Sequence, residues 1–270
     1  SFKDFKGSNP PATIGIVTGS SAEFYIQAAA KANGIEIGKD IILKNMPPGE
    51  QMAMPKGIDA VVPWDPTPTI MAKERKNARI ISDSFPYNIY EGTFYVRQEV
   101  IDNAPDVVQA FTDAIAEATL WIRKNPDAAV DVMQEDPNLK NYSKEILRQQ
   151  ITAYNLLYKP NYIYPIPVFW GRANEPIYTW LYESKRIQNK LTGIDFARAV
   201  DTRFMDKTFE KLGWATTTRP PFLPATWTAP MDKTPYPTYM NPLNTTTPQA
   251  FPEKGDLTKD WSYDGKTYKK

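Results

Sequence analysis

Short apolar runs alternate with helical segments over residues 12–81, and this alternation constrains the fold more than any other feature. Buried strands are predicted at runs rich in Ile and Val, namely Ala12–Val17, Ile41–Leu43, Ile58–Val62 and Ala78–Ile81. Helices are expected between them at Ala22–Ala32, Glu50–Met54 and Thr69–Lys73. Because such alternation is typical of a mostly parallel sheet covered by helices, we expect an α/β fold.

A different pattern follows residue 90. A strand is predicted at Gly92–Val96, and a long helix begins after Asn103 at Pro105 and stops at Asn125. The apolar residues of this helix recur at helical spacing: Val107, Val108, Phe111, Ala114, Ile115, Ala118 and Ile122. Further helices are expected at Asp127–Met133, Lys144–Leu157, Glu175–Lys190 and Asp206–Leu212. This part of the chain is therefore predicted to be mainly helical.

The chain changes character again from Arg219, where prolines become frequent and periodicity is lost. Such a segment is typical of an extended tail that covers a surface or reaches a partner. We find no internal repeat.

The composition excludes several classes of function. The 32 basic and 31 acidic side chains give a net charge of +1, which argues against a nucleic-acid-binding protein. The chain has no Cys and no His, so it lacks a thiol nucleophile, an imidazole base and the commonest transition-metal ligands. We expect no cofactor, no metal site and no catalytic residue in this chain. No apolar run is long enough to span a membrane, and residues 1–6 do not resemble a signal peptide.

Several stretches, read in order, resemble one protein family. They are Thr18–Glu23 with its Gly-Ser-Ser segment, Gly57–Pro66, Phe94–Ile101, Asn103–Phe111 and Val200–Phe204. Their order and spacing over about Phe5–Leu212 are similar to those of the sulfonate/nitrate/taurine (NMT1/THI5-like) solute-binding proteins. The resemblance implies a fold like that of type II periplasmic binding proteins, with two lobes that contain mostly parallel sheets.

Family members have one more βαβ block ahead of the segment that begins here at Phe5. The resemblance therefore implies a complete α/β lobe over 5–90, the helical C-terminal part of an incomplete first lobe over 91–218, and a Pro-rich tail over 219–270. We expect a second polypeptide that supplies the N-terminal block. It would lie beside the apolar stripe of the long helix, because an uncovered stripe of large apolar side chains would cost more than a typical folding free energy.

Gly19, Ser20 and Ser21 are the first candidate ligand-binding residues. They stand at a predicted helix start, where backbone N–H groups and hydroxyls can bind an anion. The alternative is an ordinary helix cap.

Trp64 and Asp65 follow a predicted strand, at the carboxyl edge where α/β proteins usually bind ligands. Trp64 could stack on a ligand and Asp65 could accept a hydrogen bond. The alternative is that Trp64 packs in the core while Asp65 caps the next helix.

Three candidates come from later in the chain. The resemblance implies that Tyr90 and Thr93 lie where the chain crosses between lobes, and the alternative is a simple hinge. Arg172 could pair with an anionic ligand, or it could be an exposed surface residue. We expect Ser20, Ser21, Trp64 and Thr93 to line one pocket. A solvated charged face is predicted at Asp195, Arg198, Asp201 and Arg203.

The resemblance implies a solute-binding protein of an ABC importer that captures a small anionic ligand, sulfonate-like or an aromatic acid, outside the cytoplasm, typically in the periplasm. Its partners would be an ABC permease and the second chain. One alternative is a subunit of an enzyme on the same fold, desulfinase-like or hydrolase-like, with catalytic residues on the missing chain. Another is an interaction subunit whose Pro-rich tail clasps another polypeptide.

Overall fold

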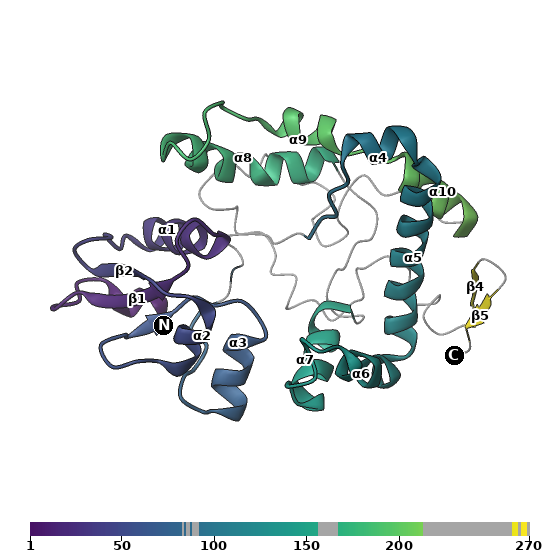
Figure 1. Ribbon diagram of the computed structural model, residues 1–270. Helices are drawn as coiled ribbons and strands as arrows, with labels where there is room; N and C mark the ends of the chain where they lie inside the picture. Colours follow the sequence, from purple (N-terminus) through teal and green to yellow (C-terminus); the bar gives the residue numbers. More distant parts are fainter. Residues whose placement is uncertain are drawn as a thin grey trace, which may run out of the picture. The chain divides into compact units, whose positions relative to one another are not determined.

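The computed structural model describes residues 1–82, 84, 87, 92–155, 167–212, 261–263 and 266–268. They belong to two compact units, and Figure 1 labels most of their helices and strands. Unit 1 contains the described residues of 1–90 and 173–191. Unit 2 contains those of 91–172, 192–228 and 239–270.

The core of unit 1 is a small parallel sheet. Its strands are β1 (Ala12–Ile16), β2 (Ile41–Asn45) and β3 (Ala60–Val61), in the order β2-β1-β3. Ile14 of β1 pairs with Leu43 of β2 and with Ala60 of β3. Because β1 is the central strand, its Ile14 and Ile16 are almost fully buried.

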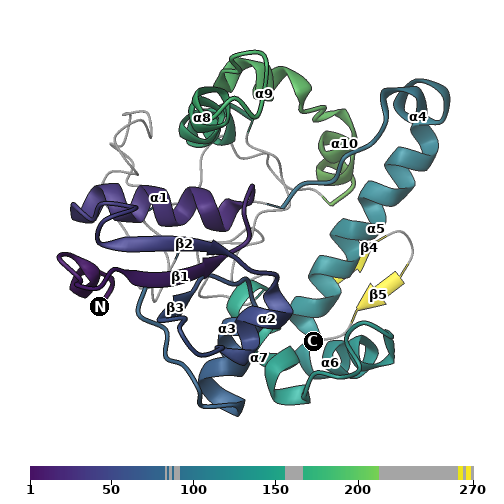
Figure 2. The same cartoon turned by 60° about the vertical axis from the view of Figure 1, so that its left-hand side comes forward.

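Helix α1 (Ser21–Asn33) packs on this sheet, as Figure 2 shows. Its buried side chains, among them Tyr25, Ile26 and Ala29, join Ile14 and Ile41 in one apolar cluster. The helix begins after an N-cap serine and ends at Gly34, which adopts the left-handed conformation (φ 64°) that suits a glycine at this position. Both ends agree with the sequence pattern.

The remaining elements of unit 1 are short. A 3₁₀ helix, η1 (Phe2–Phe5), precedes the sheet, α2 (Pro48–Ala53) follows β2, and α3 (Thr67–Thr69) with the π-helical turn η2 (Ile70–Glu74) follows β3. Helix α8 (Pro167–Glu183) contributes its residues from Ala173 onward to unit 1.

Unit 2 is mainly helical in its described part. Its elements are α4 (Gln98–Asn103), α5 (Pro105–Lys124), α6 (Pro126–Glu135), α7 (Lys144–Asn155), α9 (Gly193–Ala199), α10 (Arg203–Leu212), and the hairpin strands β4 (Trp261–Tyr263) and β5 (Lys266–Tyr268). Helices α6 and α7 pack together through Ala129, Val130, Leu147 and Ile151. Helix α10 packs on α5, where the side chain of Gln109 donates to the Thr208 hydroxyl at 3.1 Å.

The predicted strands at Ala78–Ile81 and Gly92–Val96 are wrong, since neither segment is a strand. Strand β3 is only two residues long, and the chain continues from it into Pro63, which has no N–H. Because proline cannot donate to a neighbouring strand, this edge of the sheet is poorly suited to pair with another strand. Ile80 is 62% exposed, and Gly92–Tyr95 are all exposed. These segments lack the burial that a strand of an α/β sheet requires.

Helix α8 also differs from its predicted range. The sequence pattern predicts a helix over Glu175–Lys190. The helix instead begins at Pro167, includes Pro176 in its interior and ends at Glu183.

Helix α5 has the predicted range, and part of its apolar stripe remains exposed. The side chains of Val107 and Phe111 are 58% and 45% exposed, while Ile115 and Ile122 are half-buried. The second polypeptide expected beside this stripe stays a prediction.

The fold of the described residues is thus mixed α/β with a small parallel sheet, and this part of the expectation is confirmed. The division into two lobes stays a prediction. Among the described helices, none is both long and apolar enough to cross a membrane.

Candidate functional site

Ser21 and Trp64 meet at the carboxyl edge of the parallel sheet. Ser21 is the first residue of α1, after the turn that leaves β1, and Trp64 follows β3. The indole Nε1–H of Trp64 donates a hydrogen bond to Ser21 Oγ at 3.0 Å. Parallel strands direct their carboxyl ends to one edge, which explains how residues from separate βα turns come together there.

The Ser21 hydroxyl has an unused donor among the described residues. Its oxygen accepts from Trp64, and within the described part of the chain no residue accepts its hydrogen. Both side chains are half-buried. A hydroxyl can donate one hydrogen bond while it accepts another, so Ser21 can donate to an oxygen atom of a ligand.

Ser20, by contrast, is a helix cap. Its Oγ accepts from the backbone N–H of Ala22 at 3.1 Å and donates to the carbonyl oxygen of Val17 at 2.6 Å. These bonds occupy its hydroxyl hydrogen and satisfy one N–H of the first helical turn. The geometry is that of the ordinary cap which the sequence left open as an alternative.

Gly19 already binds a carboxylate of its own chain. Its backbone has a φ of 82°, which favours glycine, and its N–H donates to Glu23 Oε2 at 2.6 Å. The adjacent N–H of Thr18 donates to Asn45 Oδ1 at 2.9 Å, which ties the turn to the end of β2. An external anion could use the Gly19 N–H only by displacing Glu23.

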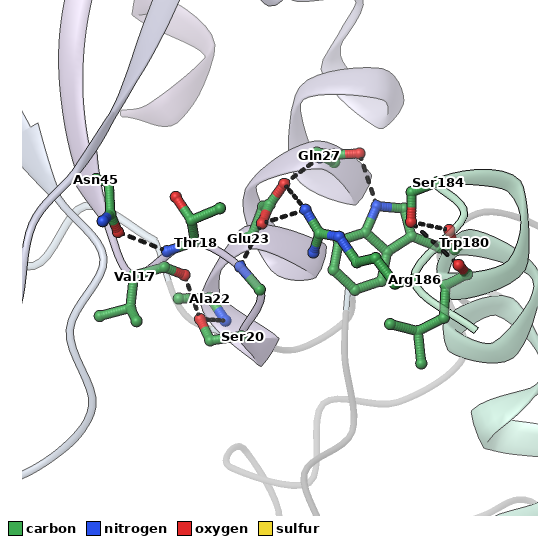
Figure 3. A network of polar contacts seen from close by, with 12 residues as sticks. Val17, Thr18, Ser20, Ala22, Glu23, Gln27, Asn45, Trp180, Ser184 and Arg186 are labelled. Carbon is green, nitrogen blue, oxygen red and sulfur yellow. Dashed lines mark hydrogen bonds and ion pairs between the residues drawn. The ribbon is translucent and has the colours of Figure 1, made fainter.

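Glu23 is 8% exposed and is the centre of the polar network in Figure 3. Arg186 Nη2 contacts both of its carboxylate oxygens, at 2.8 and 2.9 Å, and Gln27 Nε2 donates to Oε1 at 3.2 Å. Burial alone would raise the pKa of Glu23, but the hydrogen bonds from Arg186 and Gly19 outweigh it and hold the pKa below its ordinary value. The Glu23 carboxylate is therefore negatively charged at this turn, and the positive charge of Arg186 offsets it.

Comparison with protein-family models found a match for the segment that carries this geometry. Residues 1–129 match the family described as NMT1/THI5 like. This segment is NMT1/THI5-like. The match includes the sheet, the turn before α1, Trp64 and helix α5. Neither a curated protein nor a solved structure matched the chain. The family relationship supports a solute-binding function in broad terms.

Asp65, Thr93 and Tyr90 are further candidate residues of the NMT1/THI5-like segment. Asp65 is exposed, and its Oδ1 accepts a hydrogen bond from the Thr69 hydroxyl at 2.8 Å. The N-cap of α3 is Pro66, so this bond joins two side chains and does not cap the helix. Thr93 is exposed and belongs to unit 2. Tyr90 lies outside the described residues, so a pocket that includes Thr93 and Tyr90 stays a prediction.

Arg172, beyond the matched segment, lies in helix α8, and its side chain is outside the described part of the structure. Its assignment as a ligand-binding residue stays a prediction.

Sequence reasoning missed Asn45, Glu23 and Arg186. One signal was present: Ser20 and Glu23 have the Ser-x-x-Glu spacing of a capping box. In the structure the Glu23 carboxylate accepts from Gly19 N–H, one residue before the N-cap. No local pattern indicates Arg186, because it lies 163 residues from Glu23 in the chain.

Proposed function

We propose that this chain is the solute-binding component of an ABC importer and captures a small anionic ligand, sulfonate-like or an aromatic acid. The observation that carries the proposal is the hydrogen bond from Trp64 to Ser21, within a segment that matches the NMT1/THI5-like family. It leaves a hydroxyl donor beside an aromatic ring at the edge of the sheet where α/β proteins bind ligands.

The chemistry of the two residues suits an oxyanion that carries a planar group. The Ser21 hydroxyl would donate to a ligand oxygen, and a hydrogen bond to a charged acceptor contributes about 1.5–3 kcal/mol. The half-buried ring of Trp64 would stack on the planar group, worth about 0.5–1.5 kcal/mol beyond the buried area. Together they would distinguish an aromatic acid from its neutral analogue.

The charge around the turn is compatible with this ligand class. Glu23 is negatively charged, but Arg186 lies within hydrogen-bonding distance of both its oxygens. The pair therefore carries no net charge, and an approaching anion would not meet an unbalanced carboxylate.

The transport role forms part of the proposal. In it, the protein acts outside the cytoplasm, two lobes close on the ligand, and the closed form docks on an ABC permease. Closure would follow from tighter binding of the ligand to the closed state.

Isothermal titration tests the proposal with methanesulfonate, nitrate and benzoate as probes, and with benzamide as the neutral counterpart of benzoate. We expect at least one anion to bind the chain and benzamide to bind more weakly than benzoate. Ser21→Ala should weaken binding about tenfold, since it removes the donor and tenfold corresponds to about 1.4 kcal/mol.

Ser8→Ala is the matched control. Ser8 precedes β1, at the opposite end of that strand from Ser21, and is half-buried like it. Its loss should leave affinity unchanged within about twofold, a difference of about 0.4 kcal/mol. The proposal fails if the folded chain binds none of the anions, or if Ser21→Ala binds them as tightly as the unchanged chain.

A further inference from the structure

Arg186 closes a ring of contacts with three side chains of unit 1, drawn in Figure 3. Its guanidinium carbon lies 4.5 Å from the centre of the Trp180 ring, and Trp180 Nε1 donates to Gln27 Oε1 at 3.0 Å. Gln27 Nε2 in turn donates to Glu23 Oε1, which also accepts from Arg186. Each member is thereby oriented by two others.

Trp180 also fixes this ring to helix α1 by packing. Its ring makes an edge-to-face contact with the buried ring of Phe24, with centroids 5.7 Å apart. Arg186 is therefore held by its cation–π contact with an immobilised indole and by a carboxylate. A guanidinium held in this way has few alternative positions, so it restrains the carboxylate that it contacts.

The Glu23 carboxylate that Arg186 restrains also contacts the turn before α1. The oxygen of Glu23 that accepts from Gly19 N–H, Oε2, also lies 2.9 Å from Arg186 Nη2. Gly19 precedes the cap residue Ser20, and the backbone of this turn sets the direction of the Ser21 side chain. Glu23 is nearly buried, so water does not readily replace it as the acceptor of the Gly19 N–H.

We infer that Arg186 is a positioning residue for the turn Val17–Ser21 and acts on it through Glu23. Its effect on ligand affinity rests on the function proposed above for Ser21. Its effect on the turn is independent of that function. An experiment without ligand can therefore test the positioning role separately from the proposed function.

The experiment compares the whole chain with its Arg186→Met variant by NMR, without ligand. Met retains much of the apolar stem but no hydrogen-bond donor. We expect the amide proton of Gly19 to lose the downfield shift caused by the Glu23 carboxylate and to exchange with water about tenfold faster, an effect of about 1.4 kcal/mol. Amides of the central strand, such as that of Ile14, should exchange as before, which separates loss of positioning from general destabilisation.

Arg203→Met is the matched control. Arg203 also forms an ion pair, with Asp201, but it lies in unit 2 and its side chain is 66% exposed. This variant should leave the Gly19 amide unchanged. Arg186→Lys retains the charge without the planar guanidinium, so it should restore part of the shift; it also provides the test if Arg186→Met does not fold.

Titration with the anion probes completes the experiment. Arg186→Met should weaken binding, and Arg186→Lys should recover part of the affinity. The inference is overturned if the Gly19 amide is the same in the unchanged chain and in the variants of Arg186. If that amide responds while no anion binds even the unchanged chain, the positioning role stands and the proposed function fails.

Discussion

At the scale of single residues, two neighbouring serines have different roles. The hydroxyl of Ser20 is used within the chain, between the Ala22 N–H and the Val17 carbonyl. The hydroxyl of Ser21 accepts from Trp64, and among the described residues nothing accepts its hydrogen, which we propose is donated to a ligand. The same change at the two positions should therefore affect different measurements.

Ser20→Ala should lower the free energy of unfolding of unit 1 by about 1 kcal/mol, within the range of about 0.5–2 kcal/mol for loss of an N-cap. The cause is the Ala22 N–H, which would lose its acceptor. Urea unfolding followed by tryptophan fluorescence measures the change, with Ser21→Ala as the comparison. A Ser20→Ala variant as stable as the unchanged chain would show that the cap contributes nothing.

The sequence predicts the residues of this site that follow from short-range patterns, and it misses the contact between residues far apart in the chain. Ser20 as a cap, the position of Ser21 at a helix start, and Trp64 at the sheet edge all follow from short-range patterns. The ion pair of Glu23 with Arg186 joins segments that lie 163 residues apart in the chain. Only the packing of α8 on α1 creates it, so no spacing rule indicates it.

At the scale of elements, strands were predicted correctly where an apolar run is buried and wrongly where it is exposed. Ile14, Ile16 and Ile41 lie in strands as expected, whereas the similar run that ends in Ile80 and Ile81 does not. Helix α9 and the hairpin of β4 and β5 were missed although each has a signal in the sequence. Helix α9 follows a capping box formed by Thr192 and Asp195, and Asp264-Gly265 is a typical hairpin turn sequence between β4 and β5.

Helix α9 meets the first part of α8 at a close contact between two glycines of unit 2. A Cβ atom placed on Gly171 would lie 2.3 Å from the carbonyl oxygen of Gly193. The approach of the two backbones therefore requires a residue without a side chain at position 171. Glycine commonly occupies positions where two backbone segments approach closely.

Gly171→Ala should lower the free energy of unfolding by about 1–3 kcal/mol, the usual cost of overpacking, because a backbone oxygen cannot rotate away as a side chain can. Thermal unfolding measures the effect. Gly92→Ala is the control, since a Cβ there would have no atom of the described residues within 4 Å. Equal melting temperatures for both variants would contradict the close contact of α8 and α9.

At the scale of the whole molecule, the segment that matches the family does not contain every residue that supports the candidate site. The NMT1/THI5-like segment covers residues 1–129, which include the parallel sheet, the turn before α1 and Trp64. Arg186 lies outside that segment, yet it contacts the carboxylate that holds the turn. We therefore expect the later part of the chain to support a binding site whose ligand contacts come from the earlier part.

The most direct test of this account is to map where a ligand binds. The isotope-labelled chain is titrated with benzoate, methanesulfonate or nitrate, and the amide and indole signals are followed by NMR. We expect the largest shifts at the Trp64 indole N–H and at the Ser21 amide. Binding that shifts signals of α6 and α7 while the Trp64 indole signal stays unchanged would contradict it.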